Sequence, residues 1–205
     1  MKMILRAAMC GTAALALATT AQAGVTIAGS VTSITVLTND PGLVLYASPT
    51  AFASFTLDNV GDTHSTNVMT IGTQETSVGL DDLATAPVSA TFAFTSPTGA
   101  GGTANGSSSG FFRLLSACGV VAGGCGQVSW TNPTVFNFGD GGAFSVSLSN
   151  VEFATPGSAN VSATFRLISN AVPEPSTWAM LILGFGMVGG ALRSRRQTRQ
   201  TLSYS

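Results

Sequence analysis

Period-two alternation of apolar and small polar residues runs through the middle of the chain and constrains its fold more than any other feature. In "AFSVSLS" (143–149), Phe, Val and Leu share one side and serines occupy the other, and "NVSATFRLIS" (160–169) repeats the pattern. Such alternation is typical of half-buried β-strands. No stretch of the middle has a convincing 3.6-residue period with helix caps, so the sequence predicts an all-β body.

Further alternating segments lie at 25–38, 54–60 and 88–94, with a phase change near Gly29–Ser30 that predicts a bulge or turn. Turn sequences such as "NDPG" (39–42) and "FGDGGA" (138–143) separate them. Roughly nine to eleven short strands indicate an antiparallel β-sandwich or jelly-roll-like body over residues 24–171. The Gly/Ser-rich segment 96–110 is predicted to be a long mobile loop.

The N-terminus has the order of parts of a secretory signal peptide. A short basic stretch containing Lys2 and Arg6 precedes an apolar run, and "AQAG" then supplies Ala21 and Ala23 at the cleavage-site positions. Residues 1–23 are therefore predicted to be a signal helix that is removed, with Gly24 as the first residue of the mature chain.

Charge is sparse and unevenly distributed. Residues 24–171 contain eight acidic residues and two arginines, a net charge of −6, and no lysine. An acidic body repels the phosphates of nucleic acids, so nucleic-acid binding is not expected.

Cys118 and Cys125 are the two cysteines that remain after residue 23, within "CGVVAGGC". An even pair in an exported protein favours a disulfide, and the glycines before Cys125 permit the turn. A metal site would need more ligands than this segment offers.

The C-terminal segment combines a proline-restricted peptide, an apolar run and basic residues. Prolines at 173 and 175 favour an extended peptide over 172–175. The uncharged run Trp178–Leu192 would form a helix of about 22 Å, shorter than the ~30 Å hydrocarbon core, and flanking side chains can cover the difference. The arginines after it predict a transmembrane helix with its C-terminal end in the cytoplasm and the body in the periplasm.

This segment resembles the PEP-CTERM sorting signal of Gram-negative bacteria, in its Pro-Glu-Pro-x-x-Trp-Ala variant. The matching residues are Pro173, Glu174, Pro175, Trp178, Ala179, Arg193, Arg195 and Arg196. The resemblance implies recognition by an exosortase, a membrane-embedded, cysteine transpeptidase-like enzyme that cuts near the Pro-Glu-Pro segment. It assigns residues 172–205 to sorting and says nothing about the body, which resembles no family known to us.

Signals for catalysis in the body are weak. "GSSSG" (106–110) matches the letters of a nucleophile elbow but lacks the preceding strand and following helix. His64 is the only histidine, and a triad with Asp81 or Asp82 is a remote alternative to a surface role. Glu75 and Glu152 are not paired by any spacing argument. We therefore expect no enzymatic activity.

Calcium is the most plausible cofactor, although structural turns explain the same residues better. The candidate ligands are Asp58, Asn59 and Asp62 in one turn and Asp140 in another. No other cofactor or metal is expected.

Trp130 is the only tryptophan of the body. It is either a core residue, the favoured interpretation, or a stacking platform for a sugar. The main hypothesis is thus an exported, exosortase-processed surface or matrix protein with a structural or adhesive body. The alternatives are a module that binds exopolysaccharide and, with least support, a hydrolase.

Overall fold

The computed structural model describes residues 24–112, 124–171 and 175–197, which form eleven strands and one helix. The strands are β1 (Val25–Thr35), β2 (Tyr46–Pro49), β3 (Phe55–Leu57), β4 (Thr63–Thr73), β5 (Ala86–Ser96), β6 (Gly101–Phe111), β7 (Cys125–Trp130), β8 (Thr134–Phe138), β9 (Gly142–Leu148), β10 (Val151–Ala154) and β11 (Gly157–Ser169), and the helix is α1 (Pro175–Gln197). The predicted signal helix lies outside these ranges.

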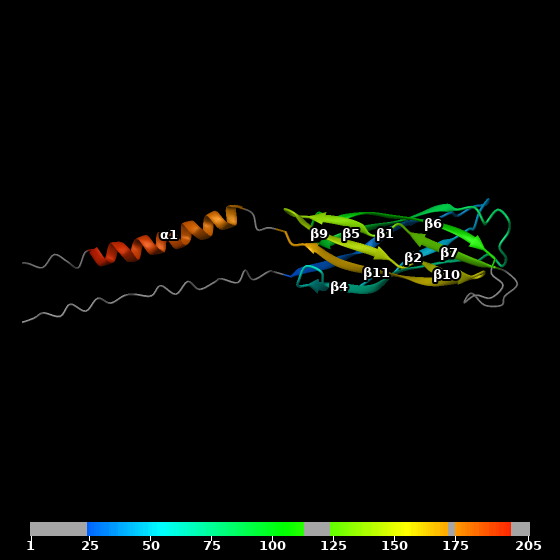
Figure 1. Cartoon of the computed structure of the whole chain (residues 1–205), viewed down its shortest axis with the longest axis horizontal. Coiled ribbons are helices and arrows are strands. Elements are labelled where there is room, and N and C mark those ends of the chain that lie inside the picture. Colours follow the sequence, from blue (N-terminus) through cyan, green and yellow to red (C-terminus); the bar gives the residue numbers. More distant parts are fainter. Residues whose placement is uncertain (1–23, 113–123, 172–174, 198–205) are drawn as a thin grey trace, which may run out of the picture.

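The strands form two curled antiparallel sheets (Figure 1). A six-stranded sheet has the order β10-β7-β6-β5-β1-β3, and a five-stranded sheet has the order β2-β4-β11-β9-β8. Every strand pair is antiparallel, including the long pairs β1–β5, β5–β6 and β4–β11. The prediction of an antiparallel all-β body is therefore confirmed.

Apolar residues of the alternating segments face one another between the sheets. Five phenylalanines, from four strands, lie at the centre of this core: Phe92, Phe94, Phe136, Phe144 and Phe165. Their rings make edge-to-face contacts, with centroids 5.0 Å apart for Phe94 and Phe144 and 5.4 Å apart for Phe94 and Phe136. Burial of one such side chain contributes about 1.5–3 kcal/mol, so this cluster is a principal source of stability.

The phase change near Gly29 is a β-bulge and not a turn. The β1–β5 register shifts between Ala28 and Gly29 and again after Val31, while β1 continues as one strand. Bulges increase the local twist of a strand, which suits a sheet that curls around a core.

The prediction of a mobile loop over 96–110 is wrong, because most of this segment is strand β6, in the middle of the six-stranded sheet. Its inward positions carry small residues, and rings of other strands fill the space above them. The indole of Trp130 lies over Gly106, where an added Cβ would come within 3.1 Å of the ring, and Phe136 lies over Gly102 at the same distance. An aromatic side chain that covers a strand glycine restores the packing that the glycine lacks.

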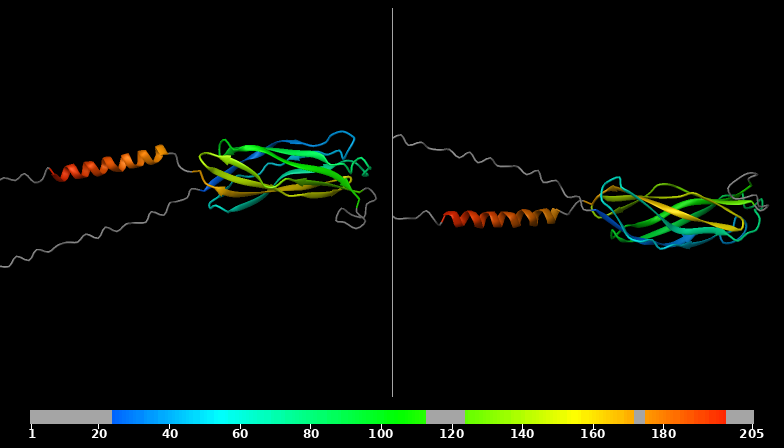
Figure 2. Two further views of the ribbon diagram at one scale, coloured as in Figure 1. Left: turned by 45° about the horizontal axis from the view of Figure 1, so that its top comes forward. Right: turned by 90° about the horizontal axis from the view of Figure 1, so that it is seen from below.

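The body is elongated, and its two ends differ in what they carry (Figure 2). Gly24, the turn after β3, the turn between β8 and β9, and the end of β11 gather at one end, from which α1 extends; we call it the α1 end. The loops after β1 and β4, the end of β6 and the β10–β11 turn gather at the opposite end, which we call the far end.

α1 begins at Pro175, which corrects the expectation that Pro175 belongs to an extended peptide. Proline is favourable in the first turn of a helix, where its missing N–H has no intrahelical partner to lose. By hydropathy and length, no helix in the described part of the chain qualifies as a membrane span. The transmembrane role of α1 therefore stays a prediction.

Candidate functional site

The last residues of β11 are held by the turn between β8 and β9, which defines where the body ends. Ser169 donates a hydrogen bond through its Oγ to the carbonyl oxygen of Gly141, at 2.7 Å. The Cβ of Ala171 lies 3.1 Å from the position that a Cβ on Gly139 would occupy, and Gly139 has a φ of +48°. A side chain at 139 would therefore crowd Ala171, and the body ends against this turn just before the sorting segment.

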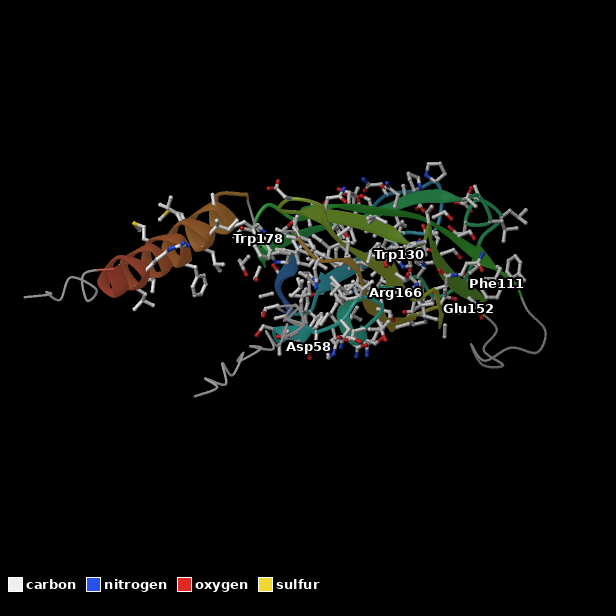
Figure 3. All side chains as sticks on the ribbon, turned by 60° about the vertical axis from the view of Figure 1, so that its left-hand side comes forward. Asp58, Phe111, Trp130, Glu152, Arg166 and Trp178 are labelled. Atoms are coloured by element: carbon white, nitrogen blue, oxygen red, sulfur yellow. The ribbon has the colours of Figure 1, made fainter. Side chains whose placement is uncertain are left out.

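Residues of the predicted sorting motif divide between the described helix and the segment before it. Pro173 and Glu174 lie outside the described residues. Pro175, Trp178 and Ala179 lie in the first turns of α1, with Trp178 51 % exposed at the end of the helix nearest the body (Figure 3). Of the topology arginines, Arg193 is exposed, and Arg195 and Arg196 lie in the last turn.

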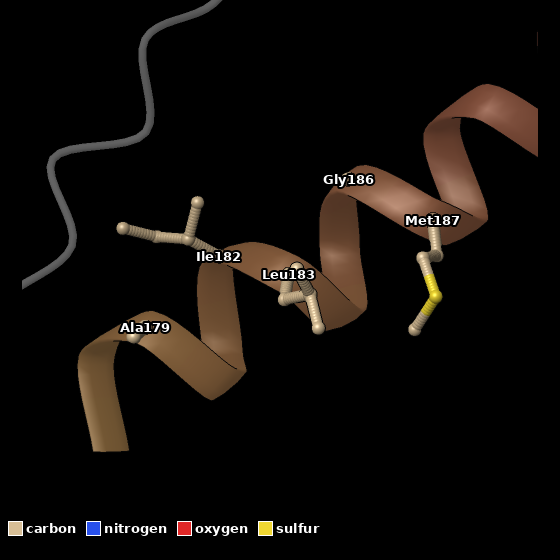
Figure 4. A pocket seen from close by; sticks show the side chains of 5 residues that line it. All are labelled: Ala179, Ile182, Leu183, Gly186 and Met187. Carbon is tan, nitrogen blue, oxygen red and sulfur yellow. The ribbon is translucent and has the colours of Figure 1, made fainter. Parts of the chain in front are cut away.

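The apolar side chains of α1 surround the helix on every side. Met180, Leu181, Ile182 and Leu183 follow one another at about 100° intervals, and all four are at least 50 % exposed. A shallow groove on one face is lined by Ala179, Ile182, Leu183, Gly186 and Met187 (Figure 4). It is shallow because Ala179 and Gly186 offer little or no side chain, and a Cβ added to Gly186 would meet open space. The body does not cover these side chains.

Three carboxylates converge at the far end of the body, one from the loop after β1 and two from the loop between β4 and β5. Asp40, Glu75 and Asp82 each offer an oxygen within 4.8 Å of the others, and their burial increases in that order. Asp82 Oδ2 accepts a hydrogen bond from the N–H of Gly79 at 2.6 Å, and Glu75 Oε1 accepts one from the N–H of Val44 at 2.9 Å. Among the described residues, this is the arrangement that could hold a cation.

Burial and the neighbouring negative charges make ionisation of Glu75 less favourable in this cluster. Burial raises the pKa of Glu75 above its usual value, and the charges of Asp82, Asp40 and Asp81 raise it further, while the hydrogen bond from Val44 acts in the opposite direction. Sequence reasoning missed the cluster because no local spacing joins the three residues. The available signal was only that the three residues lie in two loops, after β1 and after β4, that meet at the same end of the body.

The residues predicted as calcium ligands do not come together at one site in the structure. Asp62 Oδ2 accepts hydrogen bonds from the N–H groups of Asp58 and Asn59, at 3.1 and 2.8 Å, so its carboxylate organises the turn itself. Asp140 is exposed in the β8–β9 turn. These residues are not among those whose carboxylates converge in the described part of the chain.

Candidate catalytic residues are placed far apart. His64 lies at the start of β4, where its ring stacks on Phe55 at 4.0 Å, whereas Glu75, beside Asp82, follows the other end of the strand. An extended strand of 11 residues separates them by about 30 Å. Ser108 of the "GSSSG" segment lies within β6, paired with β5 and β7, and not at a strand-to-helix turn.

The sequence allowed two roles for Trp130, a core residue or a stacking platform for a sugar. In the structure its side chain is 7 % exposed and belongs to the core cluster. Its ring lies against Gly106, and its indole nitrogen is shielded from solvent. A sugar could stack on it only if the ring left the core.

Other residues singled out in the sequence lie at the edge of the described ranges or outside them. Cys125 is the buried first residue of β7, while Cys118 lies outside the described residues, so the predicted disulfide stays a prediction. Ala21 and Ala23 also lie outside, and Gly24 is the first described residue.

Comparison with known proteins identifies the C-terminal segment. Residues 171–196 match the family model of the PEP-CTERM protein-sorting motif. No curated protein and no solved structure matches the chain significantly. The chain therefore carries a PEP-CTERM sorting motif, which implies export and processing by an exosortase at the membrane.

Proposed function

We propose that a chain with this motif is made as an inner-membrane precursor, with its body in the periplasm, and is released by an exosortase to the cell surface or the extracellular matrix. There the two-sheet body has a structural or adhesive role and no catalytic one. The observation that carries the proposal is the sorting motif at 171–196, which begins at the residue where the body ends.

The helix itself supports the membrane-bound precursor. A helix that is apolar on all faces is stable only where every face meets an apolar environment. The body leaves these faces exposed, so a lipid bilayer or the helices of a membrane enzyme would have to supply that environment.

The surface of the body supports a structural role. Its outer faces carry small neutral side chains that pair across strands, such as Thr91 with Thr103 at 3.1 Å and Ser65 with Thr164 at 2.8 Å. Cross-strand pairs of this kind stabilise a sheet by about 0.2–1 kcal/mol each. The separation of His64 from the carboxylates of Glu75 and Asp82, at the other end of β4, and the burial of Trp130 favour this role over hydrolysis and over sugar stacking.

The sorting role is tested by Glu174→Gln and by Pro173→Ala with Pro175→Ala in an exosortase-competent host. The first change removes the charge of the motif and keeps its size, and the second removes the two proline rings that restrict the backbone on either side of Glu174. We expect both variants to be exported and folded but retained in the membrane at precursor length. Gln200→Ala, beyond the matched residues, is the control and should be processed as wild type.

Immunoblots of membrane and extracellular fractions give the readout. If both motif variants are processed and released like wild type, the sorting role of these residues is wrong. The structural role is tested separately, by locating the released body in the native host. Recovery of the body in the soluble culture medium, with none in the surface or matrix fraction, would contradict it.

A further inference from the structure

Four strands form the edges of the two sheets, and three of them carry features that discourage pairing with another chain. β3 has three residues, β2 has four and ends in Pro49, and β10 has four and carries the charged Glu152. Very short strands, prolines and charges are the usual means by which an exposed edge is protected.

β8 is the exception. Its sequence, Thr-Val-Phe-Asn-Phe, contains no charge and no proline, consists largely of strong strand formers, and pairs with β9 without a register shift. Its outward side chain Val135 is 49 % exposed. In the described part of the chain, no hydrogen bond from a loop or side chain reaches the outer edge of this strand.

The neighbouring strand shows how the same fold covers an edge where it needs to. β9 extends past the start of β8, and the amide of Asn132 takes the place of the missing strand there. Its Nδ2 donates to the carbonyl oxygen of Leu148 at 2.7 Å, and its Oδ1 accepts from the N–H of Leu148 at 2.8 Å. Among the described residues nothing comparable covers β8, so its outward backbone groups are available to another strand.

We propose that β8 is a self-association edge, which pairs antiparallel with β8 of a second copy of this chain around a two-fold axis at Phe136. The arrangement joins two five-stranded sheets into one continuous sheet. Phe136 and Phe138 stay in the core of their own copy, where both are buried, so pairing uses backbone groups and the outward residues only.

The positions of the charges permit a second copy and select the antiparallel direction. Asp140 follows β8 by two residues. In the antiparallel pair the two Asp140 carboxylates would be about 25 Å apart, beyond the Debye length of about 8 Å, so they would not repel. In a parallel in-register pair they would lie about 5 Å apart, the spacing of neighbouring strands, and would oppose association.

The direction of pairing has a consequence that rests on the proposed function. Copies held in one membrane by α1 all point the same way, so their β8 strands are parallel and cannot form the antiparallel pair. Copies released from the membrane can turn to face each other. Self-association of the body would thus follow processing and not precede it.

A charge-swap series tests the edge and its direction together. In the antiparallel pair Val135 lies opposite Asn137 of the other copy. The double variant V135K/N137K places lysine opposite lysine, whereas V135K/N137E places lysine opposite glutamate at both contacts. The control Y46K/S48K adds two lysines to β2, at exposed positions of the other edge of the same sheet.

Sedimentation equilibrium of the exported chain, purified in detergent micelles, gives the monomer–dimer constant over roughly 1–100 µM. We expect V135K/N137K to weaken dimerisation at least tenfold, and both V135K/N137E and Y46K/S48K to stay within about threefold of wild type. Far-UV circular dichroism and thermal unfolding check that each variant is folded.

Three results would overturn the proposal. A wild-type chain that stays monomeric over this range has no such edge. Equal constants for all variants would mean that α1, and not β8, drives association. If V135K/N137E dimerises as weakly as V135K/N137K, the antiparallel direction is excluded. Because none of these measurements depends on an exosortase, failure of the sorting proposal would show in the immunoblots and not here.

Discussion

At the scale of single residues, the far end of the body concentrates side chains whose chemistry depends on their surroundings. Glu75 shares a small volume with Asp40 and Asp82, and its pKa is raised chiefly by burial. A carboxyl whose pKa is higher in the folded chain than in the unfolded one makes folding less favourable as the pH rises through the interval between the two values. Glu75 therefore lowers the stability of the body at neutral pH.

Glu75→Gln should raise the free energy of unfolding at pH 7, by up to about 1 kcal/mol because solvent screens a partly exposed group. The amide oxygen can still accept the hydrogen bond from Val44. The gain should shrink as the pH falls through the raised pKa and vanish below the ordinary value of 4.5. Urea unfolding between pH 3.5 and 7 measures it, with Asp140→Asn as a control that removes one exposed charge. A gain that does not depend on pH would contradict this account.

Cys118 and Cys125 are expected to form a disulfide in the exported chain, because they are an even pair in an oxidising compartment. Closing a loop of this size would stabilise the fold by roughly 2–3 kcal/mol. Alkylation of denatured chain, followed by mass spectrometry, should label both cysteines only after reduction. Equal labelling with and without reductant would show two free thiols.

At the scale of elements, the sequence predicts the strands whose own side chains supply the apolar face. β5, β9 and β11 alternate apolar and polar residues, and each lies where the alternation places it. β6 could not be predicted in this way, because its inward positions are Gly102, Ala104 and Gly106 and the apolar groups above them belong to other strands. The apolar side chains that cover such a strand belong to its neighbouring strands, so its own sequence does not reveal that it is buried.

Gly106→Ala should therefore destabilise the body by about 1–3 kcal/mol, the usual cost of overpacking a core. An added Cβ would lie 2.4 Å from the carbonyl oxygen of Ser129 and 3.1 Å from the ring of Trp130, and a paired backbone carbonyl cannot move aside cheaply. Gly101→Ala in the same strand is the milder comparison and should destabilise less, since its nearest atom, the carbonyl oxygen of Phe92, is 3.2 Å away. Thermal unfolding that gives the same midpoint for both variants would argue against close packing over β6.

At the scale of the whole molecule, the acidic residues gather mostly at the two ends of the body. Asp58, Asp62 and Asp140 lie at the α1 end, and Asp40, Glu75, Asp81 and Asp82 lie at the far end. The excess of acidic residues was evident from the sequence, but their grouping was not, because turns distant in the chain meet only after the strands have paired. The sorting motif could be recognised from the sequence, since its parts are contiguous and need no fold to bring them together, but the start of α1 at Pro175 was missed.

This grouping predicts that salt stabilises the body. Raising NaCl from 0.05 to 0.5 M should increase the free energy of unfolding at pH 7 by roughly 1 kcal/mol, because screening weakens repulsion within each end. Asp81→Asn, which removes one charge from the far end, should respond less. Urea unfolding at each salt concentration gives the comparison, and a salt response as large in this variant as in wild type would argue against repulsion at that end.

The position of β11 determines how the body would bear a mechanical load. It is the last and, with thirteen residues, the longest strand, it lies between β4 and β9, and its end leads to α1. A pull on the C-terminal segment would act along β11, so the hydrogen bonds to β4 and β9 would be strained together in shear and not opened one at a time. An edge strand in that place would unzip at low force. While its tether remains, the body is thus attached through the strand that is hardest to extract.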